Sequence, residues 1–277
     1  MSEYQESVPS RSRRRRRWFE YKSQIPVSWS IFLGISIWAI FFGLWHIANL
    51  RGWAPAIILP APPEVITALY ELIVEKGFLY DIWTSVWRVV VGFAAACAVS
   101  APLGVLMGSF KTVEGFFNPL VSAWRYVPAA ALIPLLLMWL GTGELVKISI
   151  LFLGAVWFLI TLIMDHTKAV RAELIETALT LGATRKQVLM TVVLPAVSPD
   201  IVTSARQMLA ASWTYLVIAE ITAQTTGIGA MMMRSRRFIH VDEIMAGILV
   251  IGLLGLMFDL LFRLVHRLMF SYLEESE

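Results

Sequence analysis

The feature that most constrains this chain is a series of long apolar runs that lack acidic and basic side chains. Apart from His46, none occurs in residues 23–50, and none at all occurs in residues 89–110, 126–143 or 148–164. A helix needs about 20 apolar residues to cross the hydrocarbon core of a bilayer. These four runs therefore predict four membrane-spanning helices.

Two weaker spans follow near residues 200–222 and 244–265, and they are interrupted by Arg206, Glu220 and Asp259. The chain is 58% hydrophobic and 16% charged, whereas soluble domains are about a quarter charged. We therefore expect an all-α membrane protein with six transmembrane helices. The same composition excludes a soluble or secreted protein.

The first 24 residues form a basic tail with the run RSRRRRR at Arg11–Arg17, and residues 25–54 contain the first expected span. This apolar stretch is longer than a signal-peptide core, and no small-residue cleavage site follows it. Beside a membrane helix, a basic run indicates contact with anionic lipid on the inner face rather than with nucleic acid. Cys97 is the single cysteine, so no disulfide framework is expected.

The placement of Lys and Arg predicts the orientation, because cytoplasmic loops carry the excess of these residues. With the N-terminus in the cytoplasm, the inner side holds the basic tail, Lys111, Lys168, Arg185 and Lys186. Six spans then return the C-terminal tail, residues 268–277, to the cytoplasm.

Residues 62–76 follow the first span and are expected on the outer surface. Pro62 and Pro63 suit the first turn of a helix. Val65, Leu69 and Leu72 recur at helical spacing, with charged residues on the other faces. The pattern predicts a periplasmic amphipathic helix that lies along the membrane.

A polar segment, ETALTLGATRKQVLMTVVLP, lies between the fourth and fifth expected spans. Gly182 fits a turn after a first helix, and Thr184 with Gln187 forms a capping-box pattern for a second helix. We expect the second helix to end at Pro195 and the fifth span to begin at Ser198–Pro199. Residues 166–198 then form a cytoplasmic helix–turn–helix that can fill a groove on another protein.

The spacing in this segment is more specific than its helix signals. The segment matches a pattern of E-A-A, three residues, G, nine residues and then I-x-L-P. The matching residues are Glu176, Ala178, Gly182, Val192, Leu194 and Pro195. Two departures are mild: Thr177 replaces the second residue of E-A-A, and Val192 replaces the isoleucine. The segment resembles the signature loop of the membrane subunits of bacterial ABC importers. The alternative is a plain amphipathic linker.

The resemblance extends over residues 55–267, in stretches such as LPAPPEV, TSVWRVVVGF and LIPLLLMWLGTGELVKI. These stretches are similar to the branch that imports nitrate, sulfonates, taurine and bicarbonate, and most similar to its sulfonate and taurine permeases. MMMRSRRF departs from that branch, because Arg234 and Arg237 stand beside the more usual Arg236.

The resemblance implies a type I ABC importer permease fold in the bacterial inner membrane. It implies a homodimer that binds two ATPase subunits, which hold ATP and Mg, and a periplasmic substrate-binding protein. The ATPase-coupling residues would be Glu176, Ala178, Gly182, Ala183, Thr184, Arg185, Leu194 and Pro195. The chain has no P-loop motif of its own, so we expect no enzyme activity and no bound cofactor.

Charged residues inside spans are costly and mark candidate functional positions. The expected substrate pathway or gate comprises Arg125, Arg206, Trp213, Glu220, Thr225, Thr226, Gly227 and Gly229. Arg206 is the candidate anion attractor, and Glu220 is expected to fix the outer gate. The alternative for each charge, including Arg88, Asp259 and Arg263, is helix pairing or snorkelling.

Two other function classes compete with the importer permease. A gradient-driven secondary transporter or channel would need buried acids in several spans and often shows repeat symmetry. A membrane enzyme would need a cluster of nucleophile, base or metal ligands. Intramembrane acids are few, and the histidines are scattered without a metal-ligand spacing, so the sequence favours the permease and predicts no metal site.

Overall fold

The computed structural model describes residues 25–55, 57–223 and 225–271, and this part of the chain is helical without strands. It divides into two units, Met1–Trp53 and Ala54–Glu277. The first unit contributes one described helix, α1 (Val27–Leu50), which has no buried residue. Its 24 residues span about 36 Å, enough for one bilayer crossing.

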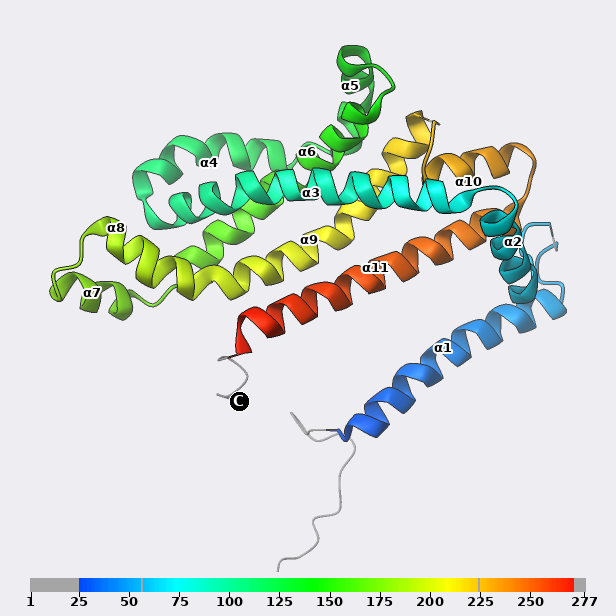
Figure 1. The fold of residues 1–277 in the computed structure, drawn as a ribbon, viewed down its shortest axis with the longest axis horizontal. Helices are drawn as coiled ribbons and strands as arrows, with labels where there is room; N and C mark the ends of the chain where they lie inside the picture. The colour runs from blue at the N-terminus through cyan, green and yellow to red at the C-terminus, as the bar shows by residue number, and fades with distance from the viewer. Residues whose placement is uncertain (1–24, 56, 224, 272–277) are drawn as a thin grey trace, which may run out of the picture. The chain divides into compact units, whose positions relative to one another are not determined.

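The second unit contains the remaining helices (Figure 1). They are α2 (Pro62–Val74), α3 (Phe78–Ser109), α4 (Lys111–Arg125), a 3-10 turn (Ala129–Leu132), α5 (Ile133–Leu140), α6 (Glu144–Lys168), α7 (Ala172–Thr180), α8 (Arg185–Val188), a π-helical turn (Leu189–Val193), α9 (Leu194–Ala223), α10 (Ile228–Arg237) and α11 (Val241–Met269).

Five helices in the described chain are long and apolar enough to cross a membrane, and a bent pair could form a sixth crossing. The pair consists of residues 111–125 and 129–140, which meet at 85°. The break falls at Val127–Pro128, because a residue before proline is disfavoured in the helical region. The structure thus shows an all-α membrane fold with five or six candidate spans.

The core of the second unit is formed where α3, α6, α9 and α11 pack together. Leu151, Leu159 and Leu216 are fully buried in it. α2 packs on α11 and buries Val65 and Leu72 on one face, and its place along the outer membrane surface stays a prediction.

Small residues let α3 and α6 approach closely. Gly92, Ala96, Ser100, Gly104 and Gly108 recur every fourth residue along α3. A Cβ atom at Gly104 would lie 2.8 Å from Ile163 Cβ and 3.0 Å from the Ile160 carbonyl oxygen. In a membrane, where the lipid is as apolar as the side chains, such close backbone packing is a main source of helix association.

The second helix of the polar segment 166–198 does not end at Pro195, so the predicted boundary there is wrong. Residues 185–223 form one helix of 39 residues, and Ser198 donates to the Pro195 carbonyl inside it at 3.0 Å. The π-helical turn at 189–193 directly precedes Pro195. Its wider turn accommodates the proline ring, which would otherwise clash with the carbonyl four residues earlier.

We predict that Gly104→Ala lowers the midpoint of thermal unfolding of the purified chain. Overpacking a tight interface costs about 1–3 kcal/mol. The matched control is Gly252→Ala in α11, where an added Cβ meets nothing within 4 Å. An unchanged midpoint for Gly104→Ala would contradict the close α3–α6 contact.

Candidate functional site

Residues 166–198, the polar segment between two candidate spans, form a compact knuckle of two helices joined by a left-handed turn. Gly182 has φ +85°, a conformation that glycine adopts without steric cost. The Thr184 backbone N–H donates to Gln187 Oε1 at 2.8 Å, and the Gln187 backbone N–H donates to Thr184 Oγ1 at 3.4 Å. This is the predicted capping box, and it begins the long helix that continues into α9.

The knuckle carries exposed apolar side chains along its helices and at its turn. Leu174, Leu179 and Met190 are about half exposed, and Leu181, next to the Gly182 turn, is 83% exposed. Behind the tip, a cavity of about 380 Å³ separates the knuckle from the ends of α3 and α6. Exposed apolar patches rimmed by polar residues are typical of interaction surfaces.

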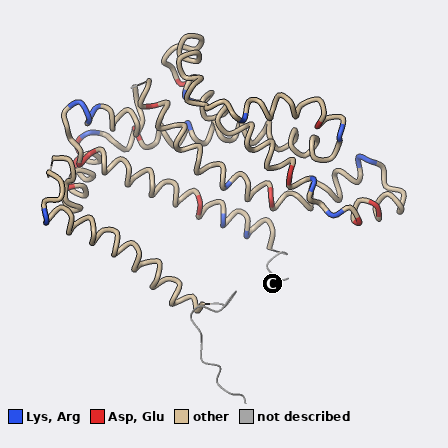
Figure 2. Tube along the Cα trace, turned by 180° about the vertical axis from the view of Figure 1, so that it is seen from behind, with Lys and Arg blue, Asp and Glu red and all other residues tan. Residues whose placement is uncertain are grey.

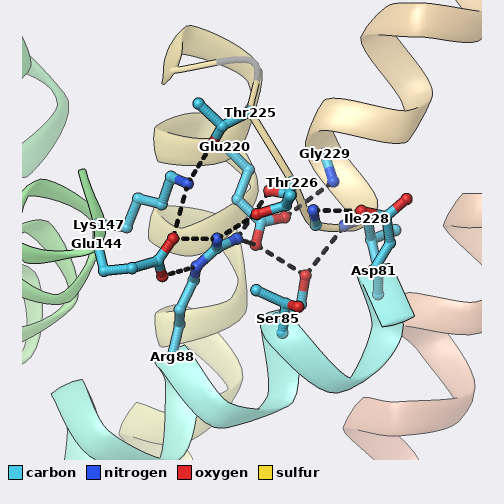
Figure 3. Close-up of polar contacts among 12 residues, drawn as sticks. Asp81, Ser85, Arg88, Glu144, Lys147, Glu220, Thr225, Thr226, Ile228 and Gly229 are labelled. Carbon is cyan, nitrogen blue, oxygen red and sulfur yellow. Dashed lines mark hydrogen bonds and ion pairs between the residues drawn. The ribbon is translucent and has the colours of Figure 1, made fainter. Parts of the chain in front are cut away.

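The first turns of α3 place three polar side chains on one buried face. Asp81, Ser85 and Arg88 are spaced by four and three residues and are each at most 6% exposed. Residues at this spacing lie above one another on a helix. This face meets the ends of α6 and α9 and the segment 225–229 (Figure 3).

Arg88 connects two carboxylates from different helices. Its Nε and one terminal nitrogen each donate to Glu144 at 2.6 Å, and its other terminal nitrogen donates to Glu220 at 2.6 Å. The side chains of Arg88 and Glu220 are 0% exposed. A guanidinium offers five donors in a planar fork, which suits such two-sided pairing.

The same side chains hold the segment between α9 and α10. Arg88 donates to the carbonyl and the hydroxyl of Thr226, both at 2.7 Å. Asp81 accepts the Gly227 backbone N–H at 2.6 Å, and Glu220 accepts that of Gly229 at 2.9 Å. The segment is therefore fixed to α3 and α9 through its own backbone.

Gly227 is required by this arrangement. Its φ is +109°, and a Cβ atom there would overlap the Glu220 carboxylate. The backbone thus approaches the carboxylate more closely than any side chain would allow.

Lys147 and Arg234 complete this group of polar side chains around Arg88. We call the group the outer cluster, after the membrane face predicted for it. Lys147, 0% exposed at its side chain, lies 3.4 Å from Glu144 and donates to the Thr225 hydroxyl. Arg234 pairs with Asp81 at 2.6 Å. The cluster balances three cations, Arg88, Lys147 and Arg234, against three anions, Asp81, Glu144 and Glu220, as burial of charge requires.

A second ion pair lies beside this cluster. Lys76 donates to Glu243 at 2.5 Å, and this hydrogen bond raises the pKa of Lys76 above its usual value. The lysine therefore stays charged at neutral pH. The contact joins the loop after α2 to the first turn of α11.

The knuckle and the outer cluster lie at opposite ends of α3. Gly108 and Ser109 line the knuckle cavity, and Arg88 lies about 30 Å away along the helix at about 1.5 Å per residue. That separation matches the thickness of the hydrocarbon core. In Figure 2, charged residues are concentrated toward the ends of the helices of this unit.

The structure brings together only part of the predicted gate. Glu220, Thr225, Thr226, Gly227 and Gly229 all belong to the outer cluster.

The other predicted pathway residues lie elsewhere. Arg125 ends α4, over the ring of Tyr126 at 5.5 Å. Trp213 is buried against Phe258 with ring centroids 5.9 Å apart. Arg206 pairs with Asp259 at 3.1 Å.

Asp81, Ser85 and Glu144 were not singled out from the sequence. Arg88 directly precedes the apolar run 89–110, but α3 begins ten residues earlier, at Phe78, so Arg88 is an interior residue of the helix. The helical spacing of Asp81, Ser85 and Arg88 is the signal that could have found this face. Asp259 pairs with Arg263 at 2.8 Å, in agreement with the pairing alternative for these two charges.

The described residues contain no group of three or more His, Cys, Asp or Glu that could hold a metal ion. The outer cluster consists of cations paired with carboxylates, so its oxygens are already engaged. Its chemistry is that of a structural ion network.

Comparison with known proteins identifies the family. Residues 100–271 match the model of the binding-protein-dependent transport system inner membrane component. The taurine transport system permease protein TauC of Escherichia coli is 33% identical over 248 residues, covering 87% of this chain and 90% of its own. The nitrate import permease protein NrtB of Synechocystis is 29% identical, covering 73% and 76%.

A solved structure shows the same fold. A chain of the inward-facing MetNI methionine ABC transporter superposes with a TM-score of 0.61 at 19% identity, covering 70% of this chain and 97% of that chain. The protein belongs to the family of binding-protein-dependent transport system inner membrane components, the permease subunits of ABC importers. It is a transport subunit and not an enzyme. Membership of this family disfavours the alternative of a gradient-driven transporter or channel.

We predict that Arg88→Met destabilises the chain strongly, because it leaves Glu220 buried without its cation. Breaking such a pair costs about 3–5 kcal/mol. Adding Glu220→Gln to Arg88→Met should cost less than the sum of the two single changes, with a coupling of about 0.5–3 kcal/mol. The free energy of unfolding in detergent titrations measures all three variants.

The control for this cycle is Arg171→Met. Arg171 pairs with Glu173 at 3.4 Å, and its side chain is 76% exposed, so the expected cost is under about 1 kcal/mol. Strictly additive effects of Arg88→Met and Glu220→Gln would contradict the buried network.

Proposed function

We propose that the chain is the permease of an ATP-driven importer for a small anion of the sulfonate class, with taurine as the leading candidate. Its identity and coverage are higher with the taurine permease than with the nitrate permease. The observation that carries the proposal is this similarity over nearly the whole of both chains, together with the predicted signature loop in a projecting knuckle.

In this function, two copies of the chain form the pathway in the bacterial inner membrane. Two ATPase subunits bind ATP and Mg beneath them, and a periplasmic binding protein delivers the anion. Both termini face the cytoplasm, on the same side as the knuckle. The excess of Lys and Arg assigned to that side supports this orientation.

The knuckle is the proposed coupling element. Its exposed tip at Leu181 and its left-handed turn at Gly182 fit a groove on the ATPase, with Glu176, Ala178, Ala183 and Arg185 on the surfaces beside the turn. Leu194 and Pro195 begin α9, and the helix continues without a break to Ala223. Movement of the knuckle is therefore transmitted along about 60 Å of helix.

The outer segment 225–229 is the proposed gate. Glu220 stands on the last turn of α9 and holds Gly229 through its carboxylate. A tilt of α9 would shift Glu220 relative to Arg88 on α3 and strain the contacts that pin the segment. The gate would thus respond to the knuckle through one rigid helix.

We predict that Gly182→Leu abolishes most ATP-driven uptake while membrane insertion and folding persist. Nothing lies within 4 Å of an added Cβ at Gly182, so the side chain projects into the space where the ATPase would bind. Uptake and ATP hydrolysis of the reconstituted complex measure the effect.

Two controls separate docking from backbone strain. Gly77→Leu creates the same strain, since Gly77 has φ +66° and open space around it, but it lies near the outer surface. Gly182→Asn relieves the backbone strain, because Asn tolerates the left-handed region, but it still adds a side chain at the docking surface. Gly77→Leu should therefore retain uptake, whereas Gly182→Asn should lower it, and normal uptake by Gly182→Leu would refute the docking role.

We predict that vesicles containing the chain, its ATPase and its binding protein accumulate labelled taurine when ATP is inside. Nitrate and bicarbonate are the comparison anions. Taurine uptake driven by an ion gradient without ATP would contradict the proposed mechanism, and uptake of nitrate alone would correct the substrate class.

A further inference from the structure

A separate basic pocket lies between α9 and α11, away from the outer cluster. Its volume is about 240 Å³, and it is lined by Val202, Thr203, Arg206, Phe262, Arg263, His266 and Arg267. No acidic residue is among these lining residues. The pocket combines three guanidinium groups and an imidazole with an apolar wall.

One nearby carboxylate orients two of the arginines. Asp259 lies 3.1 Å from Arg206 Nε and 2.8 Å from Arg263 Nε. A guanidinium has five N–H donors, so these contacts leave both groups with donors for a further acceptor. Arg206 and Arg263 share this one carboxylate, so the pair keeps an excess of positive charge, which favours an anion.

The depth of the pocket corresponds to a membrane interface. α11 has 29 residues, about 43 Å of helix, which exceeds the hydrocarbon core of about 30 Å. Arg263 and Arg267 lie in its last two turns, and blue segments mark this C-terminal part of α11 in Figure 2. The first turn of α11 is at the Lys76 end, so the pocket is on the opposite, cytoplasmic side.

An apolar stripe runs beside the pocket. Leu260, Leu264 and Leu268 recur every fourth residue of α11 and are 56%, 52% and 72% exposed. Leu264 and Leu268 each follow one of the pocket arginines in sequence. A ligand with a phosphate and an acyl chain would satisfy the pocket and the stripe together.

We propose that this pocket binds the phosphate of an anionic phospholipid from the cytoplasmic leaflet. Basic pockets between helices at this face suit such headgroups. The lipid would bridge α11 to α9, the helix that continues from the knuckle. Its acyl chain would cover the leucine stripe, and Arg206 would contact lipid phosphate rather than the transported anion.

The test is native mass spectrometry of the purified full chain with phosphatidylglycerol, and with phosphatidylcholine for comparison. Wild type should retain phosphatidylglycerol preferentially. Arg263→Gln with Arg267→Gln should weaken that binding roughly 30-fold, and each single change about five-fold. Lys111→Gln, an exposed lysine assigned to the same membrane face but outside the pocket, should leave it unchanged.

Both arginines are exposed, and the thermal unfolding midpoint in phosphatidylcholine verifies that the variants fold. Should the double variant not fold, the single variants carry the same test. Equal phosphatidylglycerol retention by wild type and the folded variants would overturn the proposal. Displacement of the lipid by excess taurine or inorganic phosphate would also overturn it, and would assign the pocket to a soluble anion. These readouts need no transport, so they stand apart from the importer function.

Discussion

The buried guanidinium of Arg88 is the interaction on which the outer half of the fold depends. A charge in a fully buried position needs partners, and here Glu144 and Glu220 supply them from α6 and α9. The same group also donates to the Thr226 carbonyl and so helps to hold residues 225–229 in place. Three helices and a loop are thus fixed by one side chain.

The long helix of residues 185–223 relates this network to the knuckle. One end carries the capped turn at Thr184, and the other end carries Glu220. In the proposed mechanism, the close packing of α3 on α6 through small residues gives this helix a firm surface to move against. The proposed lever needs no flexible joint between its two ends, because the π-helical turn accommodates Pro195 without interrupting the helix.

Local signals in the sequence predicted local structure well. The Gly182 turn and the Thr184–Gln187 box depend on residues within a few positions, and the α2 pattern depends on one helical face. The predicted end of the knuckle helix at Pro195 was wrong, because proline usually ends or kinks a helix. Here the π-helical turn before Pro195 lets the helix continue. From the sequence, Glu220 was grouped with residues 225–229 of the outer cluster as candidate gate residues. The pairing of Glu220 with Arg88 was not predicted, because the partners are more than a hundred residues apart and no single-helix periodicity links them.

The most direct test of the account is whether the outer end of α9 responds to nucleotide at the ATPase. Thr222 is exposed on the last turn of α9, so Thr222→Cys in a Cys97→Ala background reports its accessibility to a membrane-impermeant thiol reagent. In reconstituted complexes, the labelling rate should change when a non-hydrolysable ATP analogue binds, and Gly182→Leu should remove that change. An identical rate with and without the analogue would contradict transmission along the helix.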